Sequence, residues 1–116
     1  MRLLHEMLSA CLAAVLLACA SDPVALASER YRATRDASSL EVICGALRSG
    51  MTRSEVEGWV GEPAYSPVPG QDYYASDRRS PEGIYGLVVE YRRLERDGSV
   101  TETDRLQEFR CEAIGE

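Results

Sequence analysis

The chain has 116 residues, a length that allows one domain at most. Its 19 acidic and 13 basic residues give a net charge of −6, which argues against nucleic acid as a partner and against binding of anionic lipid by bulk charge. The only histidine, His5, lies in an expected signal peptide, so the processed chain has no imidazole for Ser-His-Asp or Cys-His catalysis or for a metal site. We therefore expect a protein that is not an enzyme, with no catalytic residue, metal, cofactor or small-molecule substrate indicated.

Residues 1–18 have the features of a secretory signal peptide. Arg2 supplies a positive charge near the start, and the uncharged apolar run Leu8–Ala20 follows. This run has about 13 residues, whereas a membrane-spanning helix needs about 20. The short run predicts export rather than a membrane span.

Two processing sites compete at the end of this run. Leu16-Leu17-Ala18-Cys19 resembles a lipobox, in which cleavage precedes a cysteine that becomes lipidated. Ala25-Leu26-Ala27 matches the A-x-A pattern of ordinary signal peptidase. We favour lipid attachment at Cys19, because the lipobox directly adjoins the apolar run, and cleavage after Ala27 is the alternative.

Processing leaves two cysteines that can pair with each other. Cys11 is removed with the signal peptide, and Cys19 is either lipidated or removed. Cys44 and Cys111 remain as an even pair in an oxidising compartment, and this predicts a disulfide between them.

Residues 19–37 are polar and rich in small side chains, so we expect a flexible tether there. The folded domain is expected at residues 38–116. Its first element is a helix over Ser39–Ser49, capped by Ser38 and ended by Gly50. The helix would bury a stripe of residues with i, i+3, i+4, i+7 spacing, namely Leu40, Ile43, Cys44 and Leu47.

A second helix is specified by the segment that follows Gly50. Thr52 can cap it, and Glu55 three residues later can complete a capping box. Gly61 and Pro63 are expected to end it. Trp59 is expected to pack this helix on a sheet.

Strand patterns occupy the rest of the chain. We expect strands over Gln71–Ser76, Ile84–Glu95 and Val100–Ile114, with a loop at Pro67–Gly70, a charged turn at residues 77–83 and a hairpin turn at residues 96–99. Leu106 and Phe109 are three positions apart, so in a regular strand their side chains would point to opposite faces. This predicts a bulge or a break between them. The order predicts an α+β two-layer sandwich of two helices on a three-stranded antiparallel meander.

Eight residues of the second helical segment carry a resemblance to a known family. The segment has the pattern G-M-T-x-x-E-V-x-x-W-V-G-x-P, in which the matching positions are Gly50, Met51, Thr52, Glu55, Val56, Val60, Gly61 and Pro63. With the lipobox and the element order, they resemble the SmpA/OmlA (BamE-like) family of small outer-membrane lipoproteins. The resemblance implies a lipid-anchored protein that faces the periplasm and contacts envelope proteins, including the β-barrel assembly machinery.

The leading hypothesis is a non-enzymatic lipoprotein that supports outer-membrane protein assembly or envelope integrity through protein–protein contacts. The alternatives are a soluble periplasmic binding or inhibitor module, released by cleavage after Ala27, and a small carboxylate-dependent hydrolase. The candidate partner contacts are aromatic and basic side chains, namely Tyr65, Tyr73, Tyr74, Arg78 and Arg79.

Overall fold

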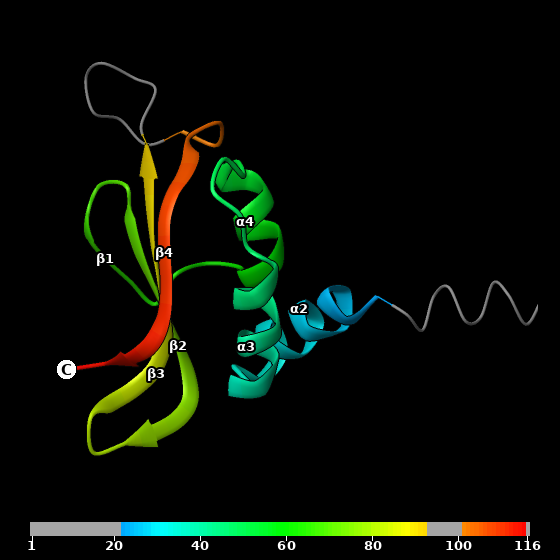
Figure 1. Cartoon of the computed structure of the whole chain (residues 1–116), viewed down its shortest axis with the longest axis vertical. Coiled ribbons are helices and arrows are strands. Elements are labelled where there is room, and N and C mark those ends of the chain that lie inside the picture. Colours follow the sequence, from blue (N-terminus) through cyan, green and yellow to red (C-terminus); the bar gives the residue numbers. More distant parts are fainter. Residues whose placement is uncertain (1–21, 93–100, 116) are drawn as a thin grey trace, which may run out of the picture.

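A computed structural model describes residues 22–92 and 101–115. In this part of the chain, three helices precede a four-stranded antiparallel sheet and pack on one of its faces (Figure 1). The elements are α2 (Pro23–Thr34), α3 (Ala37–Ala46), α4 (Arg53–Val60), β1 (Tyr65–Val68), β2 (Gln71–Ser80), β3 (Gly83–Arg92) and β4 (Arg105–Ile114). The predicted α+β class is confirmed, with one helix and one strand more than the sequence predicted.

The additional helix corrects the prediction of a flexible tether over residues 19–37. Helix α2 begins after Asp22, whose side chain accepts a hydrogen bond from the Ala25 N–H at 3.1 Å. Pro23 occupies the first helical position, where its missing N–H does no harm. Arg35 ends the helix in the left-handed conformation, with φ of 61°. The local signals for a helix were therefore present, but its buried face consists of Ala27, Ser28 and Tyr31 and has weak apolar character.

Polar contacts dock α2 on the rest of the domain. The last carbonyls of a helix have no partner within that helix. At the end of α4, the Trp59 carbonyl accepts a hydrogen bond from the Ser28 hydroxyl at 2.7 Å, and the Val60 carbonyl accepts one from Arg35 at 3.4 Å. The buried Tyr31 hydroxyl donates to the Ala75 carbonyl of β2 at 2.6 Å. Helix α2 is thus an integral part of the domain.

Helix α3 begins earlier and ends earlier than predicted. Asp36, not Ser38, is the N-cap, because its carboxylate accepts hydrogen bonds from both the N–H and the hydroxyl of Ser39. These bonds hold the pKa of the Asp36 carboxyl below its usual value. The helix ends at Ala46 because the following chain pairs with the start of β4: the Gly50 N–H donates to the Leu106 carbonyl, and the Leu106 N–H donates to the Met51 carbonyl, each at 2.7 Å.

Helix α4 confirms the predicted capping box and stop. The Glu55 N–H donates to the Thr52 hydroxyl at 3.1 Å, and the Thr52 N–H donates to the Glu55 carboxylate at 3.4 Å. Gly61 follows the helix with φ of 74°, a conformation that favours glycine.

The sheet has the strand order β1-β2-β3-β4 and includes a strand that was expected to be a loop. Strand β1 covers the first half of that loop, Pro67 and Val68, and pairs Tyr65 with Tyr73. Strand β2 extends to Ser80, through part of the expected charged turn. In β4, Gln107 is the extra residue between the pairs Tyr91–Leu106 and Glu90–Glu108, so the predicted bulge is confirmed. The expected turn at residues 96–99 lies outside the described residues.

The core lies between the helices and the inner face of the sheet. Fully buried aliphatic side chains fill it, namely Leu40, Ile43, Val56, Val60, Leu87 and Val89. The predicted disulfide is present and joins Cys44 of α3 to Cys111 of β4, with their Cα atoms 6.4 Å apart. A link across 67 positions stabilises the fold by about 4 kcal/mol in the chain-entropy description.

If α2 is integral to the domain, Tyr31→Phe should lower the free energy of unfolding by about 1–2 kcal/mol, because the variant keeps the buried ring and loses the hydrogen bond to Ala75. Urea denaturation followed by circular dichroism measures this change. Tyr65→Phe is the matched control, and its effect should stay within about 0.5 kcal/mol because Tyr65 is 61% exposed. Equal stability of Tyr31→Phe and the parent chain would contradict the docking of α2.

The double variant Cys44→Ala/Cys111→Ala should unfold with a free energy lower by up to about 4 kcal/mol, because its unfolded chain is no longer constrained. Guanidinium denaturation under oxidising conditions compares it with the parent chain. Adding a reductant should lower the stability of the parent and leave the double variant unchanged. A variant that unfolds at the same guanidinium concentration as the parent would show that the disulfide contributes no stability.

Candidate binding surface

The outer face of the sheet is the surface that the helices leave uncovered (Figure 1). Side chains alternate between the faces of a strand. In β3, Leu87 and Val89 join the core, so Ile84, Gly86 and Val88 belong to the opposite face. The ladder pairs Val88 with Tyr73 of β2. The outer face thus carries aromatic and aliphatic side chains where a solvated antiparallel sheet is commonly polar.

One half of this face forms an apolar hollow of about 160 Å³. Tyr65 stands at its border, 61% exposed, with its ring 5.9 Å from that of Tyr73 in an edge-to-face arrangement of 71°. The other lining residues are small or aliphatic, including Ala75, Ile84, Gly86 and Ile114. A cavity of about 150 Å³ can hold a benzene ring, so the hollow has room for one apolar side chain of a partner.

Gly86 allows the floor of the hollow to exist. A Cβ atom at this position would lie 2.5 Å from the Tyr74 carbonyl oxygen and 3.0 Å from the Ile114 side chain. No other residue type fits there without displacing backbone of β2. The glycine therefore lets the backbone of β2 and the Ile114 side chain pack directly against β3, and this close packing forms the floor of the hollow.

The second half of the outer face is polar. Glu90 accepts a hydrogen bond from Gln71 at 3.1 Å, and Arg110 pairs with Glu112 at 2.8 Å. These groups are satisfied by one another and exposed or half-buried. The outer face therefore combines an apolar part with a polar part, and both kinds of surface occur in protein–protein interfaces.

The structure separates the predicted contact residues. Tyr65 and Tyr73 lie on the outer face, but Tyr74 is wrong as a surface contact, because its side chain is fully buried on the inner face. Arg78 and Arg79 are exposed at the far end of β2. Cys19 lies outside the described residues.

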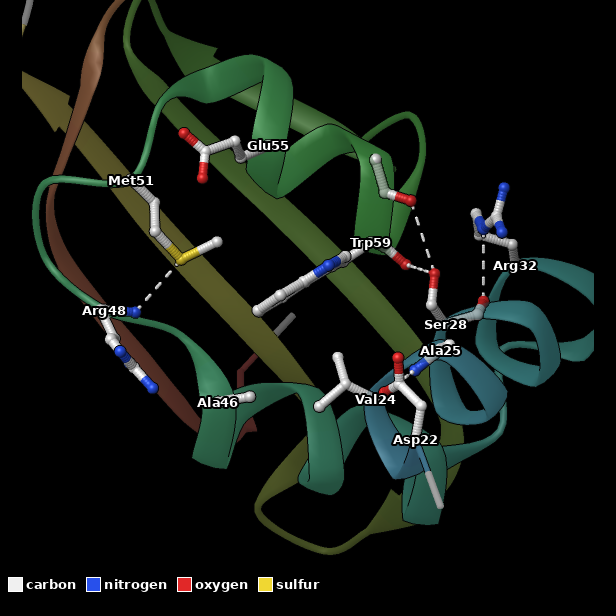
Figure 2. A pocket seen from close by; sticks show the side chains of 11 residues that line it. Asp22, Val24, Ala25, Ser28, Arg32, Ala46, Arg48, Met51, Glu55 and Trp59 are labelled. Atoms are coloured by element: carbon white, nitrogen blue, oxygen red, sulfur yellow. Dashed lines mark hydrogen bonds between the residues drawn. The ribbon is translucent and has the colours of Figure 1, made fainter. Parts of the chain in front are cut away.

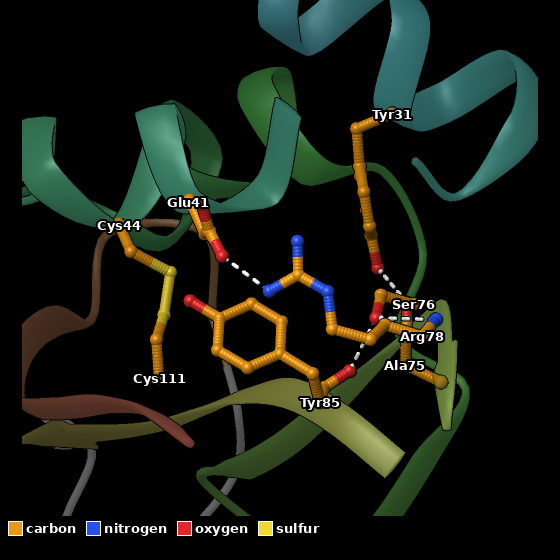
Figure 3. The surroundings of a disulfide bond; sticks show 8 residues. All are labelled: Tyr31, Glu41, Cys44, Ala75, Ser76, Arg78, Tyr85 and Cys111. Atoms are coloured by element: carbon orange, nitrogen blue, oxygen red, sulfur yellow. Dashed lines mark hydrogen bonds and ion pairs between the residues drawn. A yellow bond between two sulfur atoms is a disulfide. The ribbon is translucent and has the colours of Figure 1, made fainter. Parts of the chain in front are cut away.

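Arg78 already has partners within the domain. Its guanidinium pairs with Glu41 of α3 and lies over the Tyr85 ring, with Cζ 5.2 Å from the ring centroid (Figure 3). The Ser76 hydroxyl donates to the Tyr85 carbonyl at 2.6 Å and accepts from the Arg78 N–H. Arg78 thus ties α3 to the sheet beside the disulfide.

Sequence reasoning missed Ile84, Gly86 and Ile114. A signal for two of them was available, because the alternation that assigns Tyr85, Leu87 and Val89 to the core necessarily assigns Ile84 and Gly86 to the other face. Ile114 is brought to them only by the register of β3 and β4, which pairs it with Ile84.

A second concave surface lies between the three helices. It is an open groove of about 660 Å³ in which the Trp59 ring extends among Met51, Ala46 and Val24 (Figure 2). Two acidic and two basic side chains also line it, namely Asp22, Glu55, Arg32 and Arg48. Trp59 is half-buried against the core and half-exposed in this groove, so it joins helix to helix as well as helix to sheet.

A polar cluster is buried between α4 and the inner sheet face. Asp72 is 1% exposed and accepts hydrogen bonds from Arg53 at 2.9 Å and from the Ser66 hydroxyl at 2.6 Å. Arg53 also pairs with Glu57 at 2.9 Å and lies over the Tyr91 ring. The two carboxylates share one guanidinium, and the contacts of Arg53 join α4 to β2, which suits a structural role.

The described residues contain no group of three or more His, Cys, Asp and Glu side chains that could hold a metal ion. Among the helices that the structure describes, none has the length and apolar character needed to cross a membrane. In comparisons with known proteins, no family model, curated protein or solved structure matches the chain. The functional argument therefore depends on the residues of the chain itself.

The buried tyrosines should make the fold sensitive to alkali. Burial raises the pKa of Tyr74 and of Tyr91, and the nearby carboxylate of Asp72 raises both further. The unfolded chain releases these phenol protons near pH 10, so stability is complete below that pH and falls above it, by about 1.4 kcal/mol per pH unit for each tyrosine. Phenolate absorbance and circular dichroism, followed together against pH, measure this.

The double variant Tyr74→Phe/Tyr91→Phe is the control, because it keeps the rings and removes both titrating groups. Its stability should fall less steeply above pH 10 than that of the parent chain. If all six tyrosines ionise near pH 10 while the fold stays intact, the two phenols are accessible to solvent and this interpretation is wrong.

Proposed function

We propose that this chain is a non-enzymatic envelope lipoprotein, anchored to the outer membrane through Cys19, that supports outer-membrane protein assembly or envelope integrity by binding another envelope protein with the outer face of its sheet. The observation that carries the proposal is the apolar hollow bordered by Tyr65 and Tyr73 on a sheet face that none of the described helices covers. Such exposed apolar surface is typical of interaction sites.

The disulfide supports a location outside the cytoplasm, because such bonds persist in oxidising compartments. The resemblance of residues 50–63 to the SmpA/OmlA family supports an outer-membrane lipoprotein and suggests the β-barrel assembly machinery as the source of the partner. Neither argument depends on the hollow, so the three lines of support are independent.

Helix α2 favours processing at Cys19 over cleavage after Ala27. Ala27 is buried in the middle of α2, so cleavage there would remove the Asp22 cap, Pro23 and the first turn of an integral helix. Cleavage before Cys19 leaves the whole helix in the mature protein. The alternative function, a soluble periplasmic binding or inhibitor module, would use the same outer face after release at Ala27.

Site-specific photocrosslinking in cells tests this function. A benzophenone amino acid in place of Tyr65 should give an adduct with an outer-membrane assembly protein, identified by mass spectrometry, because this side chain borders the hollow. The same probe at Glu29, exposed on α2, is the matched control and should not give that adduct. Adding Ile114→Glu, which places a carboxylate in the hollow, should strongly reduce the Tyr65 adduct.

Failure to obtain an adduct at Tyr65 with any envelope protein would argue against the outer face as the binding surface. An adduct of equal yield at Glu29 would show that proximity, rather than a specific contact, is responsible. An adduct that appears only with a soluble periplasmic enzyme would favour the alternative of an inhibitor module.

A further inference from the structure

The link between the expected lipid anchor and the folded domain is very short. Only Ala20, Ser21 and Asp22 separate Cys19 from Pro23, the first residue of α2. A fully extended chain spans at most about 3.3–3.6 Å per residue, so Pro23 lies within about 14 Å of the lipidated cysteine. A domain on a long flexible tether could sample every orientation, but a domain on this link cannot leave the bilayer surface.

The position of α2 decides which side of the domain meets the bilayer. The N-terminal end of α2 lies on the side of the helices that faces away from the sheet (Figure 1). A helix with its side chains is about 10–12 Å across, so the helical layer separates this end from the outer sheet face. The link is at most about 14 Å long, which is little more than the width of one helix. The bilayer therefore lies beside the helices, and the outer face of the sheet is turned away from it.

The surface beside this end of α2 has the chemistry of a headgroup contact. The groove between α2, α3 and α4 begins at Asp22 itself and contains the half-exposed ring of Trp59 (Figure 2). Tryptophan is favoured at membrane interfaces, where one part of the ring is apolar and another is hydrated.

The charges in the groove indicate which headgroups fit. Arg32 and Arg48 can pair with phosphate, and Asp22 and Glu55 can pair with an ammonium group. The groove is balanced in charge although the whole chain has a net charge of −6. This balance suits a zwitterionic headgroup, which carries one phosphate and one ammonium group, better than an anionic surface.

We propose that the lipid on Cys19 holds the Trp59 groove against the zwitterionic surface of the bilayer and thereby directs the outer face of the sheet into the periplasm. This inference rests on the lipidation of Cys19, which is part of the proposed function. It adds a membrane-contacting surface and a fixed orientation, neither of which a lipid anchor alone would require.

Trp59 is the only tryptophan, so its fluorescence reports on the groove without labelling. The mature lipoprotein is purified, its acylation at Cys19 is measured by mass spectrometry, and it is placed in phosphatidylcholine vesicles that carry nitroxide groups on the headgroups. We expect the nitroxide to reduce Trp59 fluorescence by half or more. Inserting a flexible Gly/Ser linker of about 20 residues between Ser21 and Asp22, whose ends lie about 25 Å apart on average, should remove most of this quenching.

Two controls make the test specific. The same linker placed after Gly115, which is exposed, keeps the anchor short and should leave the quenching unchanged. A Trp59→Phe/Tyr65→Trp variant moves the reporter to the outer sheet face and should show much weaker quenching. If that variant does not fold, the two linker insertions still decide the question, since neither alters the core.

The outcomes separate the inference from the proposed function. Full acylation without quenching of Trp59, or quenching that persists with the long linker before Asp22, overturns the orientation and leaves the lipoprotein function intact. Stronger quenching in the variant with the moved reporter than in the parent chain reverses the orientation and also overturns it. Absence of acylation at Cys19 overturns both the proposed function and this inference.

Discussion

The hydrogen bonds that dock α2 are the interaction on which the rest of the structure depends. Ser28 and Arg35 satisfy the carbonyls at the end of α4, and the Tyr31 hydroxyl reaches across to β2. A single helix therefore joins the helical layer and the sheet. Because α2 is held this way, most of the segment that was expected to be a flexible tether belongs to the folded domain. Only three residues separate Cys19 from the first residue of α2.

The fold of the central segment was predictable because its signals are local. The capping box of Thr52 and Glu55 and the stop at Gly61 act within one or two turns of helix, and the structure contains all of them. The bulge at Gln107 was predictable for a similar reason, since Leu106 and Phe109 must both reach one face of β4. Cys44 and Cys111 could be paired by elimination, because the predicted signal peptide and lipobox account for Cys11 and Cys19.

The elements that sequence reasoning missed depend on distant residues. Helix α2 has a buried face of Ala27, Ser28 and Tyr31. This face is held in place by hydrogen bonds to α4 and β2, which a pattern of neighbouring residues cannot predict. Strand β1 contains Pro67 and forms only because β2 offers it an edge. The hollow on the outer face needs the register that pairs Ile84 with Ile114, together with the missing side chain of Gly86. Tyr74 was misplaced because adjacent tyrosines in a strand must point to opposite faces, and only the packed structure tells which one is inside.

The contacts that stabilise the fold lie on the inner side of the sheet. A folded part of about 90 residues buries a modest core, and the exposed Tyr65 and Val68 add little to that core. The disulfide between α3 and β4 and the docking of α2 both act on the inner side, where they compensate for this loss. At Gly86 the missing side chain weakens the strand but permits close contact with the Tyr74 carbonyl and the Ile114 side chain. An outer face that contributes little to folding can keep exposed apolar side chains such as Tyr65 and Val68, and this agrees with the proposal that the outer face binds a partner.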